Sequence, residues 1–264
     1  MTDPEPVTET PARRPGRWRW IVGTGALALL ALIGWLAWYP WSGVPHREVP
    51  ATPEPLASPS APAPDAAERL KAAMAAAFPE GPSADVEGSK VDYADGKIVD
   101  APFGPVLVSE GQVADAAHAD PGYVAIHYLA ADGAGFRLTG AYPQAIVLGS
   151  SGTLTEWAVS DKFGSLPVVS ASGGGSWQGY SCGSTVLEEL RPDGPVQLVS
   201  FQDTYDDSGA VADGAVTLKG VITDIVPDTS FTVKFTGTRT FEDHYVRRGN
   251  RYEREGGPSE LPEC

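Results

Sequence analysis

The sequence is poor in the residue types on which many functional sites depend. Its 264 residues include only two cysteines and four histidines, and no two histidines have the H-x-x-x-H spacing of a zinc site. Basic residues are also scarce, with 19 Lys and Arg against 34 Asp and Glu. Because binding to a phosphate backbone requires a basic surface, this balance excludes nucleic acid as a partner. The sequence predicts neither a metal nor a cofactor.

Charge is missing altogether from residues 20–41, WIVGTGALALLALIGWLAWYPW. A helix of that length would be about 33 Å long, enough to cross a hydrocarbon layer of about 30 Å. Five of the seven tryptophans flank or end this segment, and aromatic rings favour the membrane interface. We therefore predict one transmembrane helix over residues 20–41, with the lipid bilayer as its partner.

Arginines set the orientation of this span. Arg13, Arg14, Arg17 and Arg19 precede it, whereas Arg47 alone follows closely, and such clusters stay in the cytosol. The alternative, a cleaved signal peptide, fits less well because the apolar run is long and ends in bulky residues rather than at a small-residue cleavage site. Frequent Ala, Gly, Pro and Arg suit a GC-rich bacterium. The predicted location is the bacterial inner membrane, with residues 1–19 cytoplasmic and the C-terminal part periplasmic.

Residues 42–64 form a Pro/Ala-rich linker with seven prolines between Pro45 and Pro64. Such a segment adopts an extended, semi-rigid form. We expect it to hold a periplasmic domain, residues 65–264, away from the membrane. The chain beyond residue 41 contains 15 basic and 31 acidic residues, because four arginines and three carboxylates lie before it.

The periodicity of residues 65–264 predicts a mostly β fold with one N-terminal α-helix. Asp65 and Glu68 have the spacing of a capping box, and Pro79 ends the helical pattern. The remaining sequence contains about 10–12 short β-type runs separated by Gly, Pro and Asp turns. The Asp132-Gly133 and Gly249-Asn250 pairs are typical of tight hairpins. These runs predict an antiparallel β-sandwich or a barrel-like domain.

The pentapeptide GYSCG, residues 179–183, has the G-x-S-x-G form of a hydrolase nucleophile elbow. An elbow needs a strand before its serine and a helix after it, and the preceding GGGSWQ is poor strand material. A triad would use Ser181 and His244, the only downstream histidine. We keep a periplasmic serine hydrolase as the alternative function, and interpret GYSCG as structural. Nothing nearby in the sequence would activate Cys182 as a nucleophile.

A disulfide bond between Cys182 and Cys264 is the favoured role for the two cysteines. Both lie in the region predicted to be exported, where disulfides persist. The bond would join the C-terminal tail to the body of the domain. An intermolecular bridge and two free thiols remain the alternatives.

Two further segments are candidate binding surfaces. Trp177 and Tyr180 follow Gly173–Gly175 and offer rings for stacking on a sugar or a peptide; the alternative is a hairpin whose aromatics cap the core. Arg247, Arg248 and Arg251 form a basic patch on an acidic domain and suit an anionic polymer or an acidic partner. The alternative is a set of ion pairs with neighbouring carboxylates.

These features together predict a membrane-anchored periplasmic binding or scaffolding protein of the cell envelope that is not an enzyme. No combination of residues has both the chemistry and the local context of a catalytic centre. Its partner would be an envelope protein or polymer that the sequence does not identify.

Overall fold

A computed structural model describes residues 65–93 and 96–264. This part of the chain is mostly β-structure with one helix, α2 (Ala66–Ala77), which confirms the predicted fold class at that level. The predicted tail (residues 1–19), transmembrane helix (20–41) and linker (42–64) lie outside the described residues. Within the described part, no helix combines the length and apolar character needed to cross a membrane.

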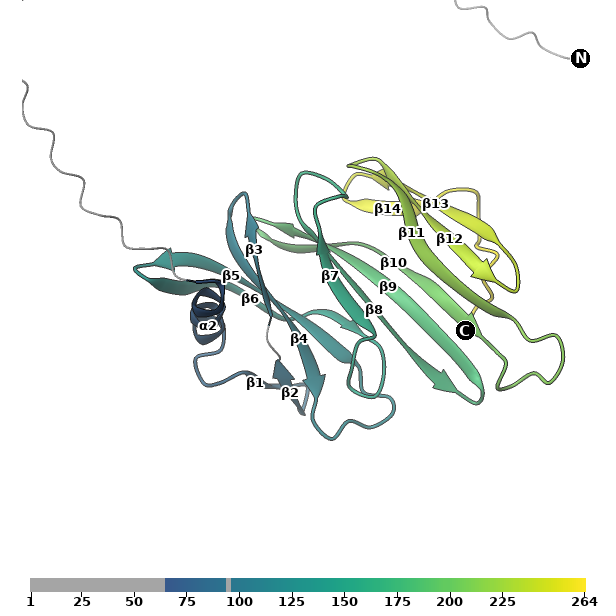
Figure 1. Cartoon of the computed structure of the whole chain (residues 1–264), viewed down its shortest axis with the longest axis horizontal. Helices are drawn as coiled ribbons and strands as arrows, with labels where there is room; N and C mark the ends of the chain where they lie inside the picture. The colour runs from purple at the N-terminus through teal and green to yellow at the C-terminus, as the bar shows by residue number, and fades with distance from the viewer. Residues whose placement is uncertain (1–64, 94–95) are drawn as a thin grey trace, which may run out of the picture. The chain divides into compact units, whose positions relative to one another are not determined.

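Helix α2 begins and ends where the sequence indicates. The side chain of Asp65 accepts a hydrogen bond from the backbone N–H of Glu68 at 2.8 Å, which satisfies one of the free donors of the first turn. The helix ends at Phe78, before Pro79. Its small residues Ala73 and Ala77 pack in a common cluster with residues of the sheet below. The helix thus covers part of one sheet (Figure 1).

The first sheet has six antiparallel strands in the order β1-β2-β4-β5-β6, with β3 also paired to β4. The hairpin of the last two strands turns at Gly133, which has a φ of +58°, as the Asp132-Gly133 pair predicts. The strands are β1 (Ser83–Val86), β2 (Ser89–Tyr93), β3 (Lys97–Ala101), β4 (Gly104–Val113), β5 (Gly122–Asp132) and β6 (Gly135–Leu148).

The second sheet is an antiparallel meander of eight strands, paired in sequence order from β7 to β14. It curls strongly (Figure 1). Glu189 and Arg247 lie on strands separated by three others, about 19 Å apart in a flat sheet, yet their side chains form an ion pair at 2.8 Å. The strands are β7 (Glu156–Ser160), β8 (Val168–Trp177), β9 (Tyr180–Arg191), β10 (Gly194–Asp206), β11 (Thr217–Val226), β12 (Ser230–Gly237), β13 (Phe241–Arg248) and β14 (Arg251–Arg254).

Two main hydrophobic clusters result from this arrangement. The "aromatic core" is formed by the eight-stranded sheet and its connections alone: Phe163, Val168, Leu187, Leu198, Phe201, Tyr205, Leu218, Phe231, Val233, Phe235, Tyr245, Tyr252 and Leu261. The "inter-sheet core" joins both sheets: Val99, Val106, Val108, Val124, Ile126, Tyr128, Ile146, Val169, Ala171, Val186 and Leu190. Successive residues of a strand point to opposite faces, so the neighbours Val186 and Leu187 enter different cores.

Two strand predictions need correction. The runs GFRLTGAY and PQAIVLG count as two of the predicted β-type runs, but they form one strand, β6, which passes through Pro143. A register shift opposite this proline removes the need for its missing N–H donor. The stretch GGGSWQ is also not poor strand material here, because Gly173–Gly175 pair regularly with β9.

Candidate functional site

A groove of about 910 Å³ lies on the eight-stranded sheet and is lined by many polar side chains. Strands β7 to β11 and the segment before β7 contribute to its walls. Its lining is rich in serine, threonine and glycine, and its ionisable side chains are His118, Glu156, Asp203 and Lys219. The groove therefore presents hydroxyl groups with charges of both signs.

A chain of hydrogen bonds connects four side chains of the lining. Thr185 donates to a carboxylate oxygen of Asp203, and its Oγ1 lies 2.7 Å from Oγ of Ser172. Because Thr185 has only one proton and donates it to the carboxylate, Ser172 must be the donor to Thr185. Thr204 donates to the other oxygen of Asp203 at 2.9 Å. Ser172 is half-buried and keeps lone pairs that accept hydrogen bonds from a ligand.

A second pair of hydroxyls lies further along the same face of β8 and β9. Ser176 and Ser181 are directly opposite each other across the strand pair, and their Oγ atoms are 2.6 Å apart. The Nε2 atom of His118 lies 2.7 Å from the backbone oxygen of Ser176. A carbonyl oxygen only accepts, so Nε2 of His118 is protonated and donates to it. Ser172, Ser176, Ser181 and Thr185 thus form a polar row.

The structure does not bring Ser181 together with His244. Ser181 lines the groove, whereas His244 lies on β13, is exposed, and does not line it. Nδ1 of His244 instead lies 3.0 Å from Oγ1 of Thr232. The serine sits within a regular strand pair and no helix follows it. The geometry of a nucleophile elbow is therefore not formed at GYSCG.

The glycines before Trp177 are needed because neighbouring segments of the polypeptide approach them closely. They do not adopt unusual backbone dihedral angles. A Cβ on Gly174 would lie 2.2 Å from the backbone oxygen of Cys182, and one on Gly173 would lie 2.8 Å from Gly149. A Cβ on Gly175 would collide with the Trp177 ring, which packs over it. None of the three has a positive φ, and all three lie within β8 rather than in the turn that follows it.

Trp177 and Tyr180 flank the two-residue turn of the β8–β9 hairpin and face each other across it. Their exposed fractions are 49% and 41%, so they do not cap the core. The Trp177 ring meets the ring of His118 edge to face, with centroids 5.3 Å apart. Both aromatics lie outside the lining of the groove. They remain a candidate stacking surface, separate from the row of hydroxyls.

The three arginines of the predicted basic patch have different surroundings. Arg247 is only 14% exposed and pairs with Glu189 at 2.8 Å and with Asp228 at 3.2 Å. Arg248 is exposed and pairs with Glu253 and Glu255 at 3.3 and 3.1 Å. Arg251 is exposed at the start of β14. Arg247 thus holds the fold together, and the exposed basic surface here is limited to Arg248 and Arg251.

Cys182 and Cys264 are bonded, in agreement with the sequence analysis, and their Cα atoms are 6.3 Å apart. The bond links residues 82 positions apart in the chain. The C-terminal segment makes further contacts nearby, because Nε2 of Gln202 donates to the backbone oxygen of Pro262 at 3.0 Å. The bond fixes this segment beside the groove, which Cys182 also lines.

Sequence reasoning missed a group of buried polar atoms between the two sheets. Oε2 of Glu188 and Oη of Tyr128 are buried without a hydrogen-bond partner among the described residues. Burial raises the pKa of Glu188 to about 7, and burial also raises the pKa of Tyr128, with a contribution from the Glu188 charge. Burial also lowers the pKa of His127 to about 4, but this ring lies on the opposite face of β5, against Phe78. The available signal was Glu188 among the apolar residues Val186, Leu187 and Leu190 of β9.

Comparisons of the chain with protein-family models, with curated proteins and with solved structures gave no match. The chemistry of the site is therefore inferred from its own side chains alone. In the groove these are hydroxyl groups organised around Asp203, with Glu156 and Lys219 at other points of the lining. Such groups are suited to binding, because hydroxyls and carboxylates supply many directional hydrogen bonds.

Proposed function

We propose that this chain is a membrane-anchored binding protein of the bacterial cell envelope, and that its β domain lies in the periplasm and is not an enzyme. The groove is its binding site, and the ligand is a neutral, hydroxyl-rich chain of the kind found in envelope glycans. The observation that carries this proposal is the row of hydroxyls on β8 and β9 that ends at Asp203.

The donor-to-acceptor direction of these hydrogen bonds supports a ligand that donates hydrogen bonds to the groove. Asp203 only accepts, and the donors Thr185 and Thr204 already satisfy part of its capacity. Ser172 donates inward and is left with acceptor positions. A sugar hydroxyl both donates and accepts, so it complements Ser172 and the Ser176–Ser181 pair. A strongly anionic ligand is disfavoured by Asp203 and Glu156 in the same groove.

Co-sedimentation with insoluble envelope glycan tests this assignment. The full-length chain, purified in maltoside detergent, should sediment with the glycan, and the Asp203→Asn and Ser181→Ala variants should sediment less. Ser184→Ala is the matched control, because Ser184 lies on the same strand but outside the lining. Equal sedimentation of all four proteins would contradict binding in the groove.

The hydrolase alternative has a separate readout. A fluorophosphonate probe reacts with an activated serine, and we expect it not to label the full-length chain. Labelling that disappears in Ser181→Ala but persists in Ser184→Ala would show that Ser181 is a nucleophile, and would replace the binding function by a catalytic one.

The proposed location rests on the apolar segment 20–41 and the arginines before it. Alkaline phosphatase fused after Cys264 is active only outside the cytosol, so the fusion should be active in cells. An inactive fusion, with equal amounts of protein, would place the β domain in the cytosol and remove the envelope from the proposal.

A further inference from the structure

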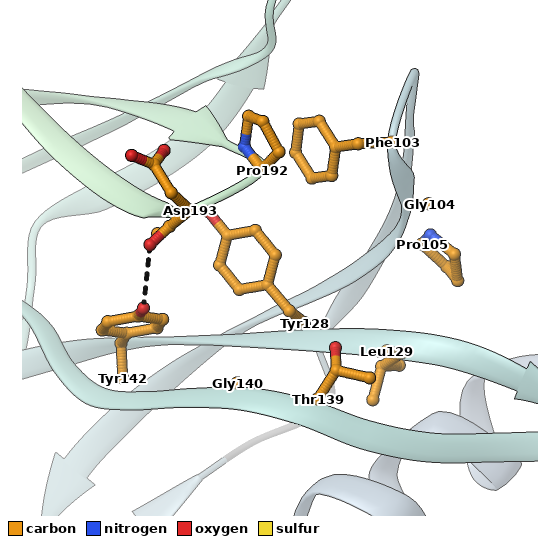
Figure 2. Close-up of a pocket in the computed structure, with 11 residues that line it drawn as sticks. Phe103, Gly104, Pro105, Tyr128, Leu129, Thr139, Gly140, Tyr142, Pro192 and Asp193 are labelled. Carbon is orange, nitrogen blue, oxygen red and sulfur yellow. Dashed lines mark hydrogen bonds between the residues drawn. The ribbon is translucent and has the colours of Figure 1, made fainter.

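A smaller cavity of about 260 Å³ lies where turns and strands of the two sheets meet, and it shares no residue with the groove. Figure 2 shows its lining, with the Tyr128 ring in the middle. The rings of Phe103 and Tyr142 lie on either side, with centroids 5.7 and 5.8 Å from that of Tyr128. Pro192 and Asp193, from the turn between β9 and β10, complete one wall.

Local backbone features hold these rings in place. The Tyr142 hydroxyl donates to the backbone oxygen of Asp193 at 3.4 Å, drawn as a dashed line in Figure 2. A Cβ on Gly194 would lie 2.5 Å from that hydroxyl, so only glycine permits this approach. Tyr128 is 7% exposed, and its hydroxyl makes no hydrogen bond of normal geometry among the described residues, although the backbone of Arg191 lies near it. The cavity is thus an aromatic site that contains an unsatisfied polar atom.

The charges around this cavity are negative. Asp193 lies in its wall, and Glu188 is close enough to Tyr128 to influence the titration of that hydroxyl. No lysine or arginine belongs to the lining. Aromatic faces attract cations, most strongly where water is excluded. The lining therefore favours an organic cation over an anion or a neutral apolar group of the same size.

We propose that the cavity bounded by Phe103, Tyr128, Tyr142 and Asp193 is a second binding site, which takes a small quaternary ammonium group. The methyl groups of such a cation contact the aromatic faces, and its charge lies near the Asp193 carboxylate. The site is separate from the groove, because the two have no lining residue in common.

Calorimetric titration of the full-length chain in maltoside micelles tests this site with two matched probes. Choline and 3,3-dimethyl-1-butanol have nearly the same shape, but only choline is charged. We expect choline to bind at least about tenfold more tightly, the effect of a cation on desolvated aromatic rings. Equal affinities would show an apolar pocket without charge selection, and no binding of either probe would show no site; both results overturn the proposal.

Variants localise the binding. Tyr142→Leu should weaken choline binding about tenfold through loss of one aromatic face, and Asp193→Asn should also weaken it. Tyr180→Leu is the control, because Tyr180 is an equally exposed tyrosine outside this cavity. Thermal melting of each variant verifies folding. Choline affinity unchanged in both cavity variants would overturn the assignment.

A final arm separates two sources of the cation. Glycerophosphocholine carries the same ammonium group as a phospholipid headgroup, together with a phosphate. Tighter binding of free choline would identify a small soluble cation as the ligand, because the negative wall repels the phosphate. Equal or tighter binding of glycerophosphocholine would identify the lipid headgroup, with the same ammonium chemistry at the site.

Discussion

The aromatic core and the inter-sheet core are both buried, but the carboxylates beside them differ in their ion-pair and hydrogen-bond partners. In the aromatic core, seven of the thirteen members carry aromatic rings, and the buried carboxylate of Glu189 beside it pairs with Arg191 and Arg247 at 2.6 and 2.8 Å. The inter-sheet core is mainly aliphatic, with Tyr128 as its one aromatic ring. The neighbouring Glu188, which points to the opposite side of β9, has an unpartnered oxygen.

Within one sheet, the paired carboxylate is explained by stability, whereas the unpaired one is better explained by function. A paired buried carboxylate is stabilised in its charged form, whereas an unpaired one carries a desolvation cost that the rest of the fold must offset. Unpartnered polar atoms in a native fold call for an explanation, and here they lie beside the cavity lined by Tyr128. We therefore infer that the aromatic core contributes most to the stability of the domain. The inter-sheet region contains the buried polar groups that lower it.

Removal of the disulfide bond should cause the largest loss of stability among these tests. It acts on the aromatic core, because Leu261 of that core lies three residues before Cys264. Closing a loop of this length is worth about 4–5 kcal/mol in the chain-entropy model. We expect Cys264→Ser to lower the free energy of unfolding by about that amount, measured by urea denaturation. Cys182→Ser and the double variant should lose the same amount, since each removes the same link. A loss below about 1 kcal/mol would show that the stability of the aromatic core does not depend on the disulfide bond.

Truncation of one side chain in each core compares the cores directly. The Phe231 ring contacts the rings of Phe163, Phe201, Tyr245 and Tyr252. Phe231→Ala should cost about 3–5 kcal/mol, because such a packed ring cluster cannot collapse into the space left. Ile126→Ala in the inter-sheet core should cost less, within the range of about 2–5 kcal/mol for aliphatic truncations. A larger loss for Ile126→Ala, from urea denaturation under identical conditions, would reverse the assignment of the aromatic core as the main support.

The sequence predicts local elements of this fold well because their causes are local. The cap at Asp65, the turn at Gly133 and the Gly249 turn, with a φ of +63°, all follow from nearby residues. The curl of the eight-stranded sheet has no such local signal, since it depends on contacts such as Glu189 with Arg247 across the sheet. The groove was missed for the same reason. Ser181 was singled out through a short motif, but its partner Ser176 lies across the β8–β9 hairpin, and the His118 ring that contacts the backbone of Ser176 comes from a distant position.

The pH dependence of stability gives the finest test of the comparison, because Glu188 and Glu189 are adjacent. Burial raises the pKa of Glu188 to about 7 from an ordinary value of 4.5, so the folded state binds this proton more tightly than the unfolded state. Its contribution to stability is therefore fully present below about pH 4.5 and is lost as pH rises towards about 7. Glu188→Gln cannot titrate. The variant should gain stability relative to the natural chain as pH rises from 5 to 7, and the difference should then level off.

Two features make this measurement specific. His127, whose pKa burial lowers to about 4, destabilises the fold as pH falls below about 6.5, but it is present in both proteins and cancels in the difference. Glu189→Gln is the matched control on the same strand. It removes a carboxylate shared by two arginines and should destabilise the fold throughout this range, because Arg191 loses its ion pair and Arg247 keeps only the one with Asp228. A pH-independent difference for Glu188→Gln, from urea denaturation at each pH, would mean that Glu188 is ionised and satisfied, and the contrast between the two glutamates would fail.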